Sequence, residues 1–252
     1  MNSSLTPLND FRSAVRFITI LPAGGAGFSA SGMIRFFPVA GLLIGMLLVL
    51  VDQGASLLWG PATAAIIDTV FLAAVTGAFH LDGLGDTADG IFSHRSKDAA
   101  LEIMKDSRIG MMGLIAVLCV LALKAAGIYS VKTSQPGSET VLFFLIVPAY
   151  ARAGMIFGIR FLPYGRPEGT GRDFFERRVA LKDFSWLAVP VIISIFTKAD
   201  FFIINLVFCI TVFAILAFYK KKMECITGDM LGAMTELTES FLFLMLGAGF
   251  LS

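Results

Sequence analysis

Three aspartates stand close together in the stretch HLDGLGDTADG, residues 80 to 90. Asp82, Asp86 and Asp89 follow one another at intervals of four and three residues, so a helix would place them on one face. Like charges at that spacing repel, and a divalent cation between them would relieve the repulsion. Carboxylate oxygens suit Mg²⁺ or Mn²⁺ better than zinc, and Mg²⁺ often completes its shell with substrate phosphate oxygens. The spacing therefore predicts a magnesium site, with a solvated acidic loop as the alternative.

A second acidic group lies far along the chain, in GDMLGAMTELTES, residues 228 to 240. Asp229 and Glu236 are seven residues apart, which again places them on one helix face, and Glu239 follows. Two acidic faces on the same side of a membrane could close around one or two metal ions. We therefore expect Asp229 and Glu236 to complete the metal site. The alternative is an interfacial helix whose acids face water.

Basic residues and glycines accompany the acids in MKDSRIGMMG, residues 104 to 113. Lys105 and Arg108 precede two glycines that open an apolar segment, a combination typical of a phosphate cradle. Asp106 could join the metal or hold Arg108 in place. The alternative is a charged cap that anchors a membrane span.

A second group of basic residues is the arginine-rich loop GIRFLPYGRPEGTGRDFFERR, residues 158 to 178, in which Arg166 stands between two prolines and several glycines. Prolines oppose helix formation, and the composition indicates a mobile basic lid over an anionic substrate. Arg152 lies inside an apolar segment, where an arginine is a functional candidate that could reach a phosphate. His80 could orient a carboxylate or accept a hydroxyl proton, or be a structural histidine at the end of a span.

The composition indicates which elements must position these groups. Hydrophobic residues make up 56% of the chain, charged residues only 15%, and the mean hydropathy is +0.80. Soluble domains are nearer 25% charged, so a single integral membrane domain over residues 1–252 is expected. The net charge of +1 argues against nucleic acid as a partner. The three cysteines form no metal-ligand pattern, so no zinc site is predicted.

The apolar segments predict an all-α polytopic membrane bundle of about seven transmembrane or re-entrant helices, each needing about 20 apolar residues to span. The candidate segments are 36–58, 62–80, 110–130, 140–159, 184–197, 201–219 and 237–251. The fifth and seventh are short. Before them, Phe11, Val15 and Ile18 recur at helical spacing opposite Arg12 and Arg16, which indicates an N-terminal interfacial helix or a helix packed on the bundle.

The charges favour one orientation. With a cytoplasmic N-terminus, all but four of the 20 Lys and Arg residues fall in cytoplasmic segments, as the positive-inside rule requires. Most acidic residues fall on the same side, which the rule does not require. The cytoplasmic face therefore has the charge pattern of an active site as well as of a topology signal.

Four blocks of sequence, in this order, resemble the cobalamin synthase family, the adenosylcobinamide-GDP ribazoletransferases. The blocks are GAFHLDGLGDTADG, MKDSRIGMMG, RPEGTG and TGDMLGAMTE. The segments FRSAVRFITILP and FFPVAGLLIG near the N-terminus are similar to the opening of that family, so the resemblance covers nearly the whole chain.

The resemblance implies a Mg²⁺-dependent transferase of the bacterial or archaeal cytoplasmic (inner) membrane. A ribose hydroxyl of α-ribazole, or of its 5′-phosphate, would attack the phosphorus next to cobinamide in adenosylcobinamide-GDP. GMP would leave, and adenosylcobalamin or its 5′-phosphate would form. The basic groups would neutralise charge, and Asp229 or Glu236 would complete the metal shell or take the hydroxyl proton. The lipid bilayer is the other expected partner, and a homo-oligomer is left open.

Three other functions agree less well with the sequence. A CDP-alcohol phosphotransferase would carry DxxDGxxAR, whereas this chain has DxxxDxxDG. A prenyltransferase would carry two aspartate-rich motifs in repeated halves, and no repeat is seen. An ion transporter would place its acids near the middle of the bilayer, in related repeats. Any other Mg²⁺-dependent membrane transferase acting on a diphosphate is the remaining alternative.

Overall fold

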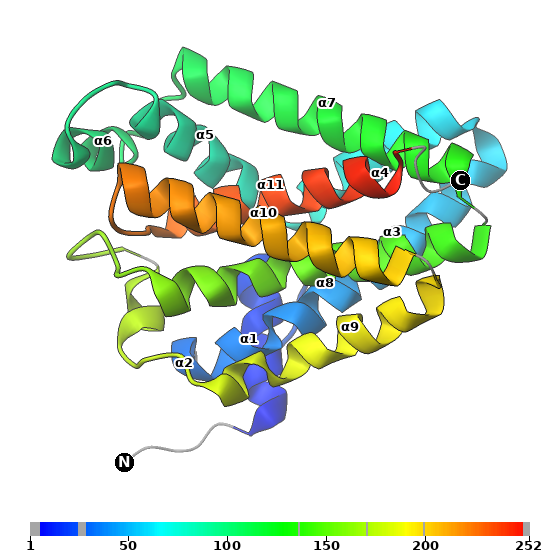
Figure 1. Ribbon diagram of the computed structural model, residues 1–252, viewed down its shortest axis with the longest axis horizontal. Coiled ribbons are helices and arrows are strands. Elements are labelled where there is room, and N and C mark those ends of the chain that lie inside the picture. The colour runs from blue at the N-terminus through cyan, green and yellow to red at the C-terminus, as the bar shows by residue number, and fades with distance from the viewer. Residues whose placement is uncertain (1–5, 25–28, 136, 170, 199, 249–252) are drawn as a thin grey trace.

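The computed structural model describes residues 6–24, 29–135, 137–169, 171–198 and 200–248. These residues form α-helices α1 to α11, with short 3₁₀ helices η1 to η4 between some of them (Figure 1). The elements are α1 (Pro7–Ile18), α2 (Ala30–Met33), η1 (Ile34–Phe36), α3 (Phe37–Leu58), α4 (Pro61–Val75), α5 (Phe79–Ile91), α6 (Lys97–Ile103), α7 (Met111–Ser134), α8 (Gly137–Phe161), η2 (Arg172–Phe175), η3 (Leu181–Leu187), α9 (Ala188–Ser194), η4 (Ile195–Thr197), α10 (Asp200–Lys222) and α11 (Gly228–Leu246). The all-α prediction is confirmed.

Four stretches of the described chain are long and apolar enough to cross a membrane. They are Ala30–Leu58, Met111–Ser134, Gly137–Phe161 and Asp200–Lys222. A fifth arises if α4 and α5 count as one span that bends by 87° at its break. The chain is thus a polytopic helical membrane protein.

The two short candidate segments differ most from a simple span. Residues 184–197 are divided among η3, α9 and η4. The segment expected at 237–251 lies in α11 as far as Leu246, and its residues 249–251 fall outside the described part of the chain. This helix already begins at Gly228, because the Thr227 hydroxyl accepts a hydrogen bond from the Met230 N–H (3.2 Å) and caps it. The acidic stretch that follows Gly228 is therefore part of α11, and most of this helix is buried.

Helix α11 lies inside the bundle, where it contacts α5, α7, α8 and α10 (Figure 1). Its buried side chains include polar ones, Glu236 and Glu239 among them. A helix that carries acids and is nevertheless enclosed on several sides must find partners for them on its neighbours. This requirement shapes the site described below.

Helix α1 is the predicted N-terminal helix, and it packs on the protein. Ala14, Val15 and Ile18 are buried against α2, η1 and α3, while Arg16 is exposed. The Arg35 guanidinium binds the buried carboxylate of Asp10 at 2.8 Å. The sequence allows two arrangements of this amphipathic helix, and its apolar face packs on the bundle.

One end of the bundle gathers the segments expected on the cytoplasmic side. Figure 1 shows α6, the end of α5, the start of α7, the ends of α8 and α10 and the start of α11 together at the left. The opposite ends of α7, α8, α10 and α11 lie at the right. The alternation of helices thus brings the basic segments of the sequence to a common end.

Candidate active site

Helix α5 carries the three aspartates, and its start is set by a sharp break after α4. Gly77 and Ala78 both adopt left-handed backbone conformations, with φ of 59° and 58°. Glycine tolerates this conformation well, whereas alanine does so at a steric cost. Because α5 is helical from Phe79 to Ile91, the predicted spacing of Asp82, Asp86 and Asp89 along one helix face is confirmed.

The aspartates of α5 come close to α11 because the two helices touch at glycines. A Cβ atom added to Gly83 would lie 2.7 Å from the carbonyl oxygen of Asp229. One added to Gly232 would lie 3.2 Å from the Cα of His80. Only residues without side chains permit so close an approach. The two acidic groups of the sequence, far apart along the chain, therefore meet at the N-terminal ends of α5 and α11.

Asp82, Asp86 and Asp229 form what we call the acidic site, together with Arg166. Asp86 interacts electrostatically with both other carboxylates and with the Arg166 guanidinium. Arg166 itself binds Asp229 at 2.6 Å. Asp82 is exposed, and Asp86 and Asp229 are half-buried, so the site is open to a ligand. Three carboxylates with one guanidinium leave an excess of negative charge that favours a cation.

Asp229 lies outside the candidate spans, in the first turn of α11. Burial raises the pKa of its carboxyl, whereas the Arg166 charge and hydrogen bond lower it less. A raised pKa makes a carboxylate a better proton acceptor than an ordinary aspartate.

The arginine-rich loop is fastened to the start of α11. Gly165 N–H donates to the Ile226 carbonyl, and Ile226 N–H donates to the Pro163 carbonyl, both at 2.9 Å. These bonds hold the next residue, Arg166, beside Asp229. Further along the loop, Arg177 binds both carboxylate oxygens of Asp183 (2.7 and 2.8 Å) and the Ser31 carbonyl (2.7 Å). At both places the loop is tied down by its hydrogen bonds.

Asp89, the third aspartate of α5, has different contacts from Asp82 and Asp86. Its carboxylate oxygens accept hydrogen bonds from the N–H groups of Gly110 (2.6 Å) and Gly113 (2.8 Å). It therefore caps the N-terminus of α7, where a negative charge is stabilising. These contacts account for Asp89 without a metal ion.

Lys105, Asp106 and Arg108 lie in the exposed segment that Asp89 ties to α5. Lys105 binds Glu102 at 2.6 Å, and Arg108 binds Asp106 at 2.6 Å. Hydrogen bonds from the side chain and the N–H of Arg108 lower the pKa of Asp106 to about 2. Of the two roles predicted for Asp106, the structure shows the one in which it holds Arg108.

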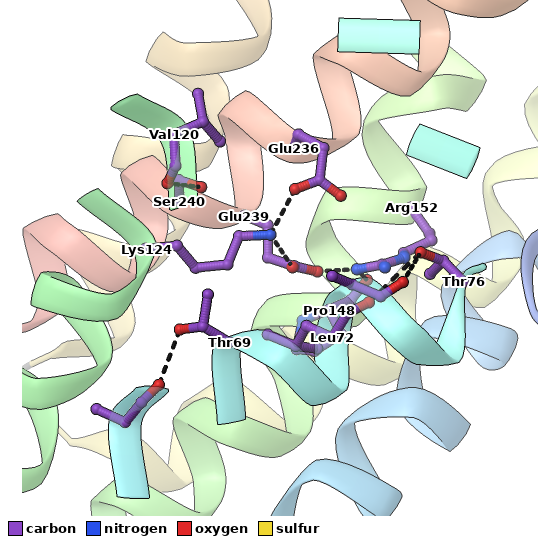
Figure 2. Close-up of polar contacts among 12 residues, drawn as sticks. Thr69, Leu72, Thr76, Val120, Lys124, Pro148, Arg152, Glu236, Glu239 and Ser240 are labelled. Carbon is purple, nitrogen blue, oxygen red and sulfur yellow. Dashed lines mark hydrogen bonds and ion pairs between the residues drawn. The ribbon is translucent and has the colours of Figure 1, made fainter. Parts of the chain in front are cut away.

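Glu236 and Arg152 do not lie in the acidic site but in a buried ion-pair cluster (Figure 2). Lys124 of α7 binds Glu236 at 2.6 Å and Glu239 at 2.7 Å. Glu239 also binds Arg152 of α8. In contrast to the prediction, Glu236 therefore does not lie beside the aspartates of α5. The physical reason is that α11 continues inward from Asp229, so a residue two turns later is enclosed by α7 and α8.

The sequence motifs predict no role for Lys124, although it belongs to this cluster. One feature of the sequence does point to it: Lys124 is a lone lysine in an otherwise apolar segment, and a lysine buried there needs an acidic partner. The cluster holds two cations and two carboxylates, so its formal charges balance.

His80 is buried beside this cluster, at the start of α5. It is 1% exposed, and within the described residues neither of its ring nitrogens has a hydrogen-bond partner. It interacts electrostatically with Arg152 and Lys124. His80 therefore faces the interior, whereas the neighbouring Asp82 faces outward.

A metal ion at the acidic site would need ligands beyond the protein. Within the described part of the chain, no three His, Cys, Asp or Glu side chains are arranged to hold a metal ion by themselves. The donors present are nevertheless of the right kind, because Asp82, Asp86 and Asp229 offer carboxylate oxygens with excess negative charge. Mg²⁺ is commonly bound by one or two carboxylates plus substrate phosphates and water. The residues therefore fit a site that a phosphate-bearing substrate completes.

Comparison with known proteins identifies relatives across nearly the whole chain. The family model described as cobalamin-5-phosphate synthase matches residues 10–247. A protein of Alkaliphilus metalliredigens named adenosylcobinamide-GDP ribazoletransferase is 34% identical over 96% of this chain and 98% of its own length. Proteins of the same name from Roseiflexus sp. (34% identical, 92% of this chain and 87% of the relative) and Rhizobium etli (33%, 91% and 93%) are also similar. No solved structure matches significantly.

Proposed function

Since the chain belongs to the cobalamin-5-phosphate synthase family, we propose that its acidic site carries out the transfer reaction of the adenosylcobinamide-GDP ribazoletransferases. The chain catalyses the step that assembles the nucleotide loop in cobalamin biosynthesis. It transfers the phosphocobinamide moiety of adenosylcobinamide-GDP to α-ribazole, or to α-ribazole 5′-phosphate, and releases GMP. The family resemblance stated from the sequence motifs is thereby confirmed.

One observation carries the assignment of this reaction to the acidic site. Asp82 and Asp86 of α5 meet Asp229 of α11 at an open surface, with Arg166 beside them. Phosphoryl transfer depends chiefly on positioning the phosphates and neutralising their charge. An acidic group that needs a cation, next to a guanidinium that can bind phosphate, suits a diphosphate substrate.

We assign Asp82 and Asp86 as the carboxylates that would hold Mg²⁺, with Asp229 facing the same site. Bound there, the ion would neutralise negative charge on the diphosphate oxygens. Arg166 is positioned by Asp229 and would contact the same phosphates. Lys105 and Arg108, which stay solvent-accessible, would neutralise phosphate charge from the segment fastened by Asp89.

In the reaction itself, a ribose hydroxyl oxygen of the acceptor forms a bond to the phosphorus next to cobinamide. The bond from that phosphorus to the oxygen bridging to the second phosphate breaks, and GMP departs with the bonding electrons. The hydroxyl proton must pass to a base. Of the two acids proposed for this role, Asp229 faces the site, whereas Glu236 is bound to Lys124. We therefore assign the proton to Asp229.

We further propose that the acidic site faces the cytoplasm. The observation that supports this orientation is the common end to which α5, α6, α8, α10 and α11 bring the basic segments (Figure 1). Basic segments next to spans are retained on the cytoplasmic side. A cytoplasmic site would also be accessible to a charged, nucleotide-bearing substrate from the cytoplasm.

The test uses the purified full chain in liposomes with adenosylcobinamide-GDP and α-ribazole, with and without Mg²⁺. Stoichiometric formation of GMP and adenosylcobalamin is expected only with the metal. Omission of α-ribazole serves as the control, because GMP release without an acceptor would indicate hydrolysis. Undiminished turnover after removal of divalent cations by chelation would contradict the magnesium assignment while leaving the transfer reaction intact.

A further inference from the structure

Two neighbouring depressions lie outside the acidic site. The first is a cavity of about 270 Å³ between the turn after α5, helix α6 and the end of α10. Its polar lining is basic and consists of His94, Arg95, Lys97 and Lys222. We call it the basic pocket. It lies at the end of the bundle to which the charged segments converge.

The basic pocket keeps an excess of positive charge. Lys97 has one acidic neighbour, Glu224, at 3.7 Å, and that carboxylate is largely exposed. Within the described part of the chain, Arg95 and Lys222 have no acidic partner. Unpaired cations that line a concave surface attract an anion.

The second depression is an apolar groove of about 430 Å³ between α5, α7, α10 and α11. Its lining includes Leu84, Ala88, Val120, Ala214 and Phe218, and it is mostly apolar. It opens between α7 and α10, both of which are candidate membrane spans with many exposed apolar side chains. In the bilayer this groove therefore faces hydrocarbon.

The basic pocket and the apolar groove adjoin each other at the end of α5. Ile91, the last residue of α5, lines both. Phe218 of the groove precedes Lys222 of the pocket by four residues, about one turn of α10. The apolar groove therefore runs along the membrane part of α10 and ends at cations near the membrane surface.

We propose that this combined site binds an anionic phospholipid of the surrounding bilayer. The headgroup phosphate lies in the basic pocket, and an acyl chain fills the apolar groove. Basic pockets between membrane helices on the cytoplasmic side are suited to anionic headgroups. A nucleotide or free phosphate would use the cations but would leave the groove empty, and a neutral lipid would leave the cations unused.

The lipid site is separate from the acidic site because it uses the other side of α5. Leu84, Ala88 and Ile91 face the groove, whereas Asp82 and Asp86 lie on the face that meets Asp229. A lipid bound there bridges α5 to α10. We therefore expect it to stabilise the helix that carries the aspartates.

The test is native mass spectrometry of the full chain in detergent with phosphatidylglycerol or phosphatidylcholine of identical acyl chains. Phosphatidylglycerol is expected to bind in preference. Each neutralisation, Arg95→Gln or Lys222→Gln, should weaken its binding about fivefold, which corresponds to about 1 kcal/mol per basic residue. Lys221→Gln is the matched control, because Lys221 adjoins Lys222 but does not line the pocket.

The groove is tested with Ala214→Phe, which should displace the acyl chain and reduce phosphatidylglycerol binding by at least as much. Ala217→Phe, also exposed on α10 but outside the groove, should leave binding unchanged. The proposal would be overturned if the unaltered chain bound phosphatidylglycerol and phosphatidylcholine equally well, and if the Arg95 and Lys222 variants did the same. So would displacement of phosphatidylglycerol by inorganic phosphate with no effect of Ala214→Phe, since the pocket would then be an anion site without an acyl chain.

Discussion

At the residue scale, the carboxylates divide into those that face a ligand and those that hold the fold. Asp86 belongs to the first group, so Asp86→Asn should reduce kcat/KM for GMP release by about 100-fold or more, because even outer partners of a metal ligand are worth 10- to 100-fold. Asp98→Asn is the matched control, an exposed acid on neighbouring α6. Equal activity of the two variants would remove Asp86 from the site.

Glu236 and Glu239 belong to the second group, because Lys124 neutralises both of these buried carboxylates. Lys124→Met should reduce the free energy of unfolding by about 3–5 kcal/mol, since it leaves an unpaired buried charge. The double variant Lys124→Met, Glu236→Gln restores the balance of charges and should recover much of this loss. Thermal unfolding in detergent measures both. If the double variant is no more stable than the single one, charge balance is not what Lys124 supplies.

At the scale of elements, the start of α7 depends on a carboxylate from α5. Asp89→Ala should remove the cap and destabilise this helix end by about 1–2 kcal/mol. Amide hydrogen exchange at residues 110–113 should accelerate, because the Gly110 and Gly113 N–H groups lose their acceptor. Asp82→Ala, on the same helix, should leave this exchange unchanged. Unaltered exchange in Asp89→Ala together with a higher Mg²⁺ concentration for half-maximal activity would make Asp89 a ligand instead.

The segment around η3 is held by a pair that responds to pH. Burial alone would raise the pKa of Asp183, but hydrogen bonds from Arg177 and the Ala180 N–H outweigh burial and lower it. Because the pKa of Asp183 is lower in the folded chain than in the unfolded chain, ionised Asp183 stabilises the segment at any pH above the unfolded-state pKa of about 4. This stabilisation is lost as the pH falls through the folded-state pKa. Proteolysis within residues 172–187 should therefore accelerate below about pH 4. Asp183→Asn should be cleaved readily at neutral pH and show little further change on acidification.

At the scale of the whole molecule, the two ends of the bundle differ in charge, and the orientation can be measured directly. In a background lacking Cys119, Cys209 and Cys225, a cysteine is introduced by Lys221→Cys or by Ser134→Cys. These positions belong to the C-terminal ends of α10 and α7, which lie at opposite ends of the bundle (Figure 1). A membrane-impermeant thiol reagent should label the first only from the cytoplasmic side and the second only from the other side. Labelling of both variants from one side would contradict a spanning arrangement of α7 and α10.

The sequence by itself determined the class of the protein, because about 20 apolar residues must be helical in a bilayer and charged segments must lie outside it. It also determined the family, the helical spacing of Asp82, Asp86 and Asp89, and the candidacy of Asp229, since these depend on local order along the chain. Only the tertiary structure decided which acids meet. Glu236 has the same helical spacing from Asp229 that Asp89 has from Asp82, yet it binds Lys124, and Asp89 caps α7. The partner of a carboxylate depends on which helix packs beside it, and the close approach of α5 and α11 at Gly83 and Gly232 is a long-range contact that periodicity along one helix does not specify.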